Sequence, residues 1–286
     1  MNVAAYVKLA RPRHWVKNVF ILMPVPFSLA SNGILEPAVL GLGITGFCLA
    51  NSGIYALNDA HDAEQDRLHE DKKTRPIAAG LISKSAGRLF GVVLLMGALA
   101  LAWSTGRPAA IEVTLAYIAI NLVYSFWARA IALLDVFLLS SGFVLRVLLG
   151  CVLVQVEASN WLLLCSSTLA LFLGLAKRRG DVVRGVDSTH RPSLAGYNLA
   201  FLDQAISVTS GMAIVAYSLY CMESAVLVPG REFATLPFVV FGVFEYLRIV
   251  QVHNQGGSPV DIILKNRVLQ LCGVGWVMAT FWSLTG

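Results

Sequence analysis

The sequence predicts an all-α, polytopic membrane protein with nine transmembrane helices in a single domain over residues 1–286. Hydrophobic residues make up 57% of the chain and charged residues only 14%, which is too little charge to cover the surface of a water-soluble domain of this length. The apolar residues form blocks of about 20, the length at which an α-helix crosses a bilayer. The basic residues lie almost entirely on one side of these blocks, as expected of a membrane protein.

Nine apolar segments follow one another along the chain. They are 15–32, 36–57, 86–105, 109–128, 132–156, 160–176, 203–221, 232–252 and 267–284. The first is the weakest, because Pro24 and Pro26 must break or kink a helix there. The two long connections, 58–85 and 177–202, hold most of the polar residues, so we expect any chemistry to take place in them.

The basic residues predict the orientation in the membrane. Eighteen of the 22 lysines and arginines open the chain or lie in connections on one side of the bilayer. They are Lys8, Arg11, Arg13, Lys17, Arg67, Lys72, Lys73, Arg75, Lys84, Arg88, Arg129, Lys177, Arg178, Arg179, Arg184, Arg191, Lys265 and Arg267. The opposite connections hold only Arg107 and Arg231. Because basic connections stay in the cytoplasm, we expect an integral cytoplasmic-membrane protein with a cytoplasmic N-terminus and, after nine spans, an external C-terminus.

Several other kinds of site find no support in the residues. No basic run is interleaved with aromatic residues, as a nucleic-acid-binding surface would require. The five cysteines lie in or beside apolar segments without a Cys-x-x-Cys pair, which is typical of small core residues. The five histidines lack metal-ligand spacing, and neither a Gly-x-Ser-x-Gly elbow nor a Walker-type phosphate loop occurs.

The strongest chemical signal is an acidic motif, Asn58-Asp59-x-x-Asp62-x-x-x-Asp66, directly after the second apolar segment. On a continuous helix, Asp59, Asp62 and Asp66 lie at i, i+3 and i+7 on one face, where three carboxylates repel one another unless a cation lies between them. Oxygen ligands of this kind suit Mg²⁺. The alternative is a solvated acidic helix end, neutralised by the basic residues that follow. Because polar groups next to a membrane span are usually functional, we favour a metal site.

Cations follow this motif within a few turns, with Arg75 preceding a proline. A metal on one side of a diphosphate and Arg or Lys on the other is a common electrostatic solution. Four further charges lie within the apolar segments. Asp135 and Arg146 are three helical turns apart, and Glu245 and Arg248, at i and i+3, are interpreted as a structural pair.

The motif and its sequel, Lys-x-x-Arg-Pro-Ile-Ala-x-Gly, resemble the first aspartate motif of the UbiA superfamily of intramembrane prenyltransferases. The resemblance covers essentially the whole chain, and five further segments resemble one branch of the superfamily more specifically. They are 11–18 (RPRHWVKN), 141–146 (SGFVLR), 177–181 (KRRGD), 256–259 (GGSP) and 264–267 (LKNR). Together these are similar to the decaprenyl-phosphate phosphoribosyltransferase branch. The resemblance implies nine helices, a cytoplasmic Mg²⁺–diphosphate site, and transfer of phosphoribose from phosphoribosyl pyrophosphate (PRPP) to a polyprenyl phosphate.

The resemblance also implies roles for individual residues. Asn58, Asp59, Asp62 and Asp66 would hold Mg²⁺ on the PRPP diphosphate. Cations would neutralise the rest of the substrate's charge, namely Arg75, Lys177 and Arg178. The lipid phosphate would lie near Arg11, Lys17 and Asn18, and Arg146 would contact a substrate phosphate. Asp181 would hold the ribose hydroxyls, reach the metal or pair with Lys177.

Two alternatives remain open at this stage. Prenyl transfer from a polyprenyl diphosphate to an aromatic or other acceptor shares the first motif, but commonly comes with a second Asp-x-x-x-Asp. Here Asp181 and Asp187 are six residues apart and face different sides of a helix. A transporter or ion-binding scaffold is compatible with charges within the membrane and with a short internal repeat, 75–80 against 191–196. Against it, the charges gather at one membrane face rather than at the middle of the bilayer.

Overall fold

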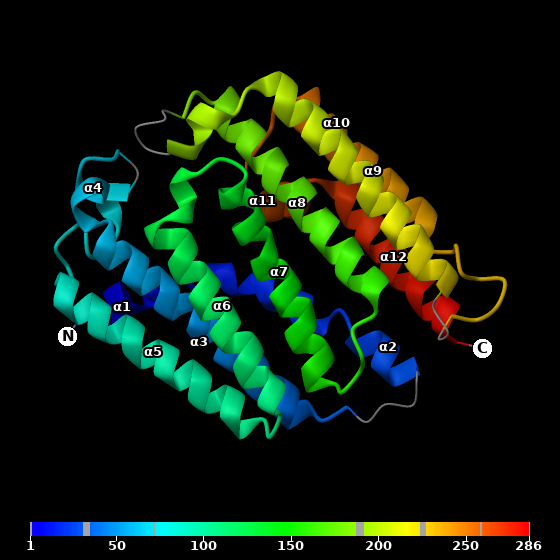
Figure 1. Ribbon diagram of the computed structural model, residues 1–286, viewed down its shortest axis with the longest axis horizontal. Helices are drawn as coiled ribbons and strands as arrows, with labels where there is room; N and C mark the ends of the chain where they lie inside the picture. Colours follow the sequence, from blue (N-terminus) through cyan, green and yellow to red (C-terminus); the bar gives the residue numbers. More distant parts are fainter. Residues whose placement is uncertain are drawn as a thin grey trace. The chain divides into compact units, whose positions relative to one another are not determined.

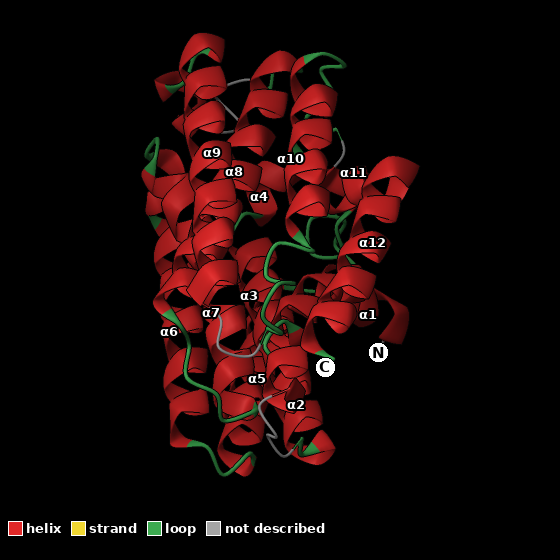
Figure 2. Cartoon of the chain, turned by 90° about the vertical axis from the view of Figure 1, so that its right-hand side faces the viewer, coloured by secondary structure: helices red, strands yellow, loops and turns green. Residues whose placement is uncertain are grey.

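The computed structural model of the protein describes residues 2–30, 35–70, 72–186, 192–223, 227–257 and 259–285. Every regular element in these ranges is a helix, and none is a strand (Figure 2). The all-α class is therefore confirmed for the described chain. Asp187 and Arg191, which the sequence analysis singled out, lie outside the described residues.

Figure 1 traces the elements in chain order. The α-helices are α1 (Val3–Ala10), α2 (Val25–Ala30), α3 (Pro37–His61), α4 (Ala63–Arg67), α5 (Lys84–Ser104), α6 (Pro108–Phe126), α7 (Leu134–Leu153), α8 (Asn160–Val183), α9 (Leu199–Glu223), α10 (Leu236–Gln251), α11 (Pro259–Lys265) and α12 (Arg267–Leu284). The 3₁₀-helices are η1 (Pro12–Leu22), η2 (Lys72–Thr74), η3 (Ala128–Ala130) and η4 (Pro192–Gly196).

Six of the described helices, α3 and α5 to α9, are long and apolar enough to cross a membrane. They correspond to the second through seventh predicted segments. α10, with 16 residues, and α12, with 18, follow the eighth and ninth predicted segments without being among the six. Nine transmembrane helices are therefore not confirmed, whereas six candidate spans are.

The first predicted span, 15–32, does not form one helix. A 3₁₀-helix ends at Leu22, Pro24 lies in the break, and α2 begins at Val25 with Pro26 in its first turn. Proline lacks the N–H that a helix interior needs and clashes with the preceding turn. The expected break is confirmed, and it is sharper than a kink.

The residue contacts of the chain group into two compact units. The first contains α1, η1, α3 to α6 and the part of α7 from Leu145 onward. Its core includes Ile21, Phe47 and Leu149. α3 and α5 approach closely at Gly53 and Gly91, where a Cβ on either glycine would lie 2.9–3.0 Å from the other's carbonyl oxygen. Small residues of this kind allow membrane helices to pack backbone to backbone.

The second unit contains α2, the part of α7 up to Val144, and α8 to α12. Its core contains residues of α7 to α10 and α12 and includes Phe172, Ile206 and Val250. Each unit thus has a buried apolar core of its own. A single domain over residues 1–286 stays a prediction.

Candidate active site

The first acidic motif lies where α3 ends and α4 begins. α3 ends at His61, and Asp62 stands between the two helices with φ −86° and ψ 3°. The Asp62 N–H donates to the Asn58 carbonyl (2.8 Å), and the Asp66 N–H donates to the Asp62 carbonyl (2.9 Å). Helical hydrogen bonding continues through the junction, but the continuous helix predicted from the i, i+3, i+7 spacing is interrupted at Asp62.

Asp59 and Asp66 are buried and share one guanidinium group. Arg75 Nη1 donates to Asp59 Oδ1 (3.1 Å) and to Asp66 Oδ2 (2.7 Å). Arg11 Nη2 donates to the same Asp59 Oδ1 at 2.5 Å. The structure thus brings together two aspartates of the motif, the arginine that follows it, and an arginine from the start of the chain.

Two oxygens of this site accept no hydrogen bond from the described residues, although both are buried. They are Asn58 Oδ1 and Asp59 Oδ2. A buried carboxylate oxygen without a donor is costly unless a cation or other ligand approaches it. Amide and carboxylate oxygens are the ligands that Mg²⁺ takes in proteins. The residues present therefore fit a divalent cation.

The geometry also limits how a metal would be held. Within the described chain, no group of three or more His, Cys, Asp or Glu side chains is close enough to bind a metal by itself. Mg²⁺ is commonly bound by one or two carboxylates, with waters and substrate phosphates completing its shell. Asp59 and Asp66 with Asn58 match that pattern, whereas Asp62 is half-buried and its part in the site stays a prediction.

Local backbone structure places the two arginines. Arg11 ends α1 in the left-handed region, with φ 51°, and its guanidinium lies 4.8 Å from the centre of the Tyr55 ring. Lys8 Nζ donates to the Thr74 carbonyl (2.8 Å), which ties α1 to the turn that carries Arg75. Both guanidinium side chains remain partly exposed, at 21% for Arg11 and 27% for Arg75. They are therefore accessible to a charged ligand.

A second polar cluster in the same unit surrounds Arg146, which is buried. Its Nε donates to Asn18 Oδ1 (2.9 Å), and its Nη2 donates to Asn51 Oδ1 (3.2 Å) and to Tyr117 Oη (3.3 Å). Asn18 and Arg146, both predicted to contact substrate, are thus side by side. The sequence analysis missed Asn51, although an asparagine inside an apolar span is itself a signal.

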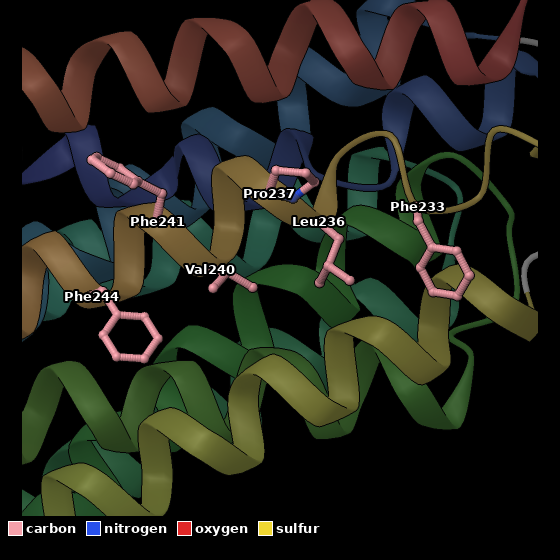
Figure 3. Close-up of a pocket in the computed structure, with 6 residues that line it drawn as sticks. All are labelled: Phe233, Leu236, Pro237, Val240, Phe241 and Phe244. Carbon is pink, nitrogen blue, oxygen red and sulfur yellow. The ribbon is translucent and has the colours of Figure 1, made fainter.

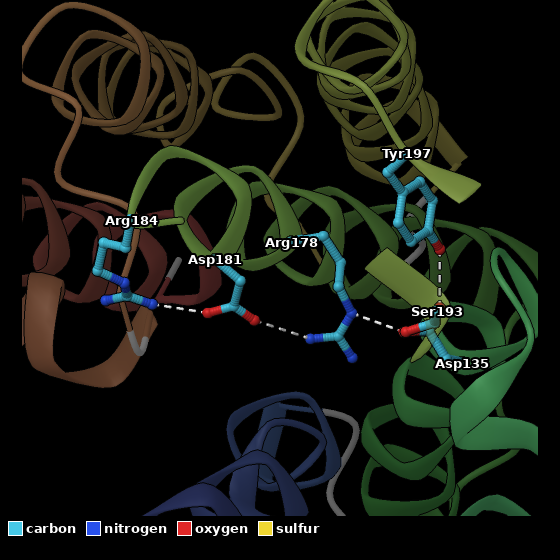
Figure 4. A network of polar contacts seen from close by, with 6 residues as sticks. All are labelled: Asp135, Arg178, Asp181, Arg184, Ser193 and Tyr197. Carbon is cyan, nitrogen blue, oxygen red and sulfur yellow. Dashed lines mark hydrogen bonds and ion pairs between the residues drawn. The ribbon is translucent and has the colours of Figure 1, made fainter. Parts of the chain in front are cut away.

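The second connection forms a chain of alternating charges in the other unit (Figure 4). Arg178 Nε donates to Asp135 Oδ2 at 2.7 Å, and both side chains are fully buried. Arg178 Nη1 lies 3.4 Å from Asp181 Oδ2, and Arg184 Nη2 donates to Asp181 Oδ1 at 2.6 Å. The predicted site residues Arg178 and Asp181 are therefore neighbours, held by internal ion pairs.

Two hydroxyl groups also donate hydrogen bonds to the Asp135 carboxylate. Ser193 Oγ donates to Oδ2 (2.9 Å) and Tyr197 Oη donates to Oδ1 (2.7 Å). Burial and the hydrogen bond to this carboxylate raise the pKa of the Tyr197 phenol, so it stays protonated. Sequence reasoning did not find Ser193, because nothing in the local sequence relates it to Asp135.

The remaining predicted charges are placed as follows. Lys17 and Lys177 are half-buried, and their roles stay predictions. Arg248 donates to both carboxylate oxygens of Glu245, at 2.7 and 2.8 Å. The expected pairing of these two residues is confirmed, and its structural role stays an interpretation.

The sequence profile of the UbiA prenyltransferase family matches residues 18–257 of this chain. The chain belongs to the UbiA prenyltransferase family. As a UbiA-type transferase with six apolar candidate spans, it is an integral membrane enzyme. The transporter alternative is not supported.

Curated relatives within the UbiA family cover most of the chain. A decaprenyl-phosphate phosphoribosyltransferase of Corynebacterium glutamicum is 30% identical, over 95% of this chain and 84% of its own length. The enzyme of the same name from Mycobacterium tuberculosis is 31% identical, over 96% and 92%. Among solved structures, a UbiA homologue from Archaeoglobus fulgidus bound to GPP and Mg²⁺ matches with a TM-score of 0.75 over 98% of each chain. At 18% identity, that likeness concerns the fold.

Proposed function

We propose that this enzyme transfers phosphoribose from PRPP to a polyprenyl phosphate, with Mg²⁺, at the cytoplasmic face of the membrane. The proposal is supported by two relatives named decaprenyl-phosphate phosphoribosyltransferase, which are 30% and 31% identical over at least 95% of the chain. It is also supported by a fold neighbour whose structure contains Mg²⁺.

One observation carries the chemistry. Asn58 Oδ1 and Asp59 Oδ2 are buried without donors, beside two arginines that are partly exposed. Asn58, Asp59 and Asp66, with Asp62 at the helix junction, would hold the metal. When bound, Mg²⁺ supplies positive charge that stabilises a diphosphate leaving group.

The chain's own cations perform the complementary part. Arg75 would donate to diphosphate oxygens, with Lys177 and Arg178 neutralising further charge. As the bond from ribose C1 to the diphosphate breaks, positive charge grows on the ring and negative charge on the departing group, which these side chains stabilise. Asp181 would accept hydrogen bonds from the ribose hydroxyls.

The acceptor needs orientation more than activation. A lipid phosphate is already anionic at neutral pH, so no general base has to remove a proton from it. Arg11, Lys17 and Asn18 would hold the phosphate, with the prenyl tail between apolar helices. Arg146 would act beside them, either on a substrate phosphate or by fixing Asn18.

The donor decides between this function and prenyl transfer. Purified protein in lipid nanodiscs would receive Mg²⁺ and a polyprenyl phosphate with PRPP, or a prenyl diphosphate with an aromatic acceptor. We expect diphosphate release and a phosphoribosylated lipid, detected by mass spectrometry, with PRPP only. Transfer from the prenyl diphosphate, without release from PRPP, would overturn the proposal in favour of prenyl transfer.

Orientation has a separate test. The basic residues predict that a reporter fused after Gly286 reads as non-cytoplasmic and one fused before Met1 reads as cytoplasmic. A cytoplasmic signal from the C-terminal fusion would mean an even number of spans. The site could then still face the cytoplasm, but the nine-span topology would be wrong.

A further inference from the structure

Two of the hollows in the second unit differ in chemistry. The first, of about 510 Å³, is apolar and is lined by Phe233, Leu236, Pro237, Val240, Phe241 and Phe244 (Figure 3). The second, of about 440 Å³, is polar and lies among the end of α8, the segment after α10, and α11. Lipid can cover an apolar face in a membrane, so of these two hollows the polar one indicates a water-soluble ligand. Its volume is within the range of small-molecule sites, roughly 300–1,000 Å³.

Two cations from different elements line this polar pocket, Arg184 and Lys265. Arg184 is 51% exposed and uses Nη2 on Asp181, while its Nη1 would lie 3.6 Å from a Cβ on Gly257. Lys265 is exposed, and no carboxylate among the described residues pairs with it. The pocket therefore offers two charged donors, one oriented by a buried carboxylate and one uncommitted.

Backbone and carboxylate groups add to this arrangement. Gly256 and Gly257 line the pocket, and their amides donate no hydrogen bond to the described residues. Asp261 also lines it and has no ion pair within the described chain. Cations with free amides suit the oxygens of a phosphate, and a carboxylate suits neighbouring hydroxyls, so together they match a phosphorylated polyol.

The glycine segment of the pocket packs directly against α8. A Cβ on Gly180 of α8 would lie 1.9 Å from the Gly256 carbonyl oxygen, so the two backbones are in direct contact. Arg179 Nη1 donates to Asn254 Oδ1 (3.0 Å) and to the Val250 carbonyl (2.7 Å), which fixes the start of the same segment. The glycine amides are thus held beside the turn of α8 that carries Asp181.

We propose that this pocket binds the phosphate monoester of a sugar phosphate, which in the reaction proposed above is the 5-phosphate end of the donor. The assignment of the ligand as the donor rests on the proposed function. Arg184 and Lys265 bind the phosphate oxygens with the glycine amides, and Asp261 accepts from hydroxyls. Asp181, through Arg184, links this pocket to the ion-pair chain of the second connection.

The test measures binding without transfer. Ribose 5-phosphate is titrated calorimetrically into purified protein in detergent, without divalent metal, and compared with ribose. We expect ribose 5-phosphate to bind and ribose to bind much more weakly. Lys265→Ala and Arg184→Ala should each weaken binding about tenfold, the size of one charge-assisted contact. Arg267→Ala removes the same charge from an exposed residue two positions from Lys265 that does not line the pocket, so it should bind as wild type.

The proposed binding site would be refuted if Lys265→Ala and Arg184→Ala left the affinity for ribose 5-phosphate unchanged. An equal loss of affinity in Arg267→Ala would also refute it. Displacement of ribose 5-phosphate by a short polyprenyl phosphate, in a manner dependent on Lys265, would assign the pocket to the lipid headgroup and also overturn it. In the transfer assay, Lys265→Ala should raise the KM for PRPP about tenfold. Lys265-dependent binding without any transfer from PRPP would leave the pocket standing and refute the proposed function alone.

Discussion

Two charged clusters use the same residue types and differ in how their carboxylates are satisfied. The first cluster consists of Asp59, Asp66, Arg11 and Arg75, and the second of Asp135, Arg178, Asp181 and Arg184. In the first cluster the aspartates are buried, Asp59 retains an oxygen without a donor, and the arginines that contact it reach solvent. In the second cluster the guanidinium of Arg178 is the buried group, and Asp135 receives it together with two hydroxyl donors. The first cluster therefore has a buried carboxylate oxygen that accepts no hydrogen bond from the described residues, whereas both oxygens of Asp135 accept hydrogen bonds.

A charged side chain in a polar connection is therefore not by itself evidence of a ligand-binding site. Unbonded buried oxygen is a stronger sign of a binding site than the number of carboxylates, because the cost of burial is then recovered only when a ligand arrives. In the second cluster, Arg178 contacts one oxygen of Asp181, and the other oxygen of Asp181 accepts from Arg184.

The largest expected effect is on stability, in the second cluster. Arg178→Ala leaves Asp135 as a buried charge without its counter-ion, which costs about 3–5 kcal/mol. We expect a large drop in the apparent Tm of the detergent-solubilised protein. The matched control is Arg67→Ala, which breaks an exposed i, i+3 pair with Glu64 and a hydrogen bond to the Ala78 carbonyl and should cost about 1–2 kcal/mol. Equal Tm values for the two variants would show that the Asp135 network is not structural.

The next effect is on turnover, in the first cluster. Asp59→Asn keeps the shape of the side chain but removes the charge that we assign to the metal, so turnover should fall at least a hundredfold, which corresponds to about 2.7 kcal/mol or more. The Tm should change little, since Arg11 and Arg75 can turn to solvent. Glu64→Gln alters an exposed carboxylate of the same segment and should retain near-normal diphosphate release. Near-normal turnover in Asp59→Asn would show that the Asp59 carboxylate is not required for the reaction.

Part of this contrast could be predicted from the sequence. Composition predicted the helical membrane class, the prolines predicted the break before α2, and the motif spacing indicated that Asp59 and Asp66 lie together, as they do around Arg75. These features depend on local geometry, since residues three to seven apart on a helix share a face.

The remaining contacts depend on tertiary packing. Arg11 reaches Asp59 from 48 residues away because α1 ends in a left-handed residue. Arg178 pairs with Asp135, which is 43 residues away in the sequence, and the residues around each of them do not indicate this partner. The break at Asp62 was not foreseen either, because no proline or glycine marks it. The spacing gave no means to rank which aspartate oxygens remain unbonded.

A smaller effect on stability is expected at the edge of the second cluster. Gly180→Ala would place a Cβ against the Gly256 carbonyl, and overpacking of this kind typically costs about 1–3 kcal/mol. We expect a moderate drop in Tm and a raised KM for PRPP. Gly211→Ala in α9 meets no atom within 4 Å and should be neutral or slightly stabilising. If Gly180→Ala were as stable as Gly211→Ala, the tight contact between α8 and the glycine segment would not exist in solution.

The most direct test of the central claim, that the first cluster and not the second takes a divalent cation, is a Mg²⁺ titration followed by thermal unfolding. With inorganic diphosphate present, Mg²⁺ should raise the Tm of the wild type, because a ligand that binds only the folded state stabilises it. A chelator should reverse the shift. Glu64→Gln should show the same shift and Asp59→Asn none. A shift of equal size in Asp59→Asn would contradict the account, because the cation would then be bound elsewhere.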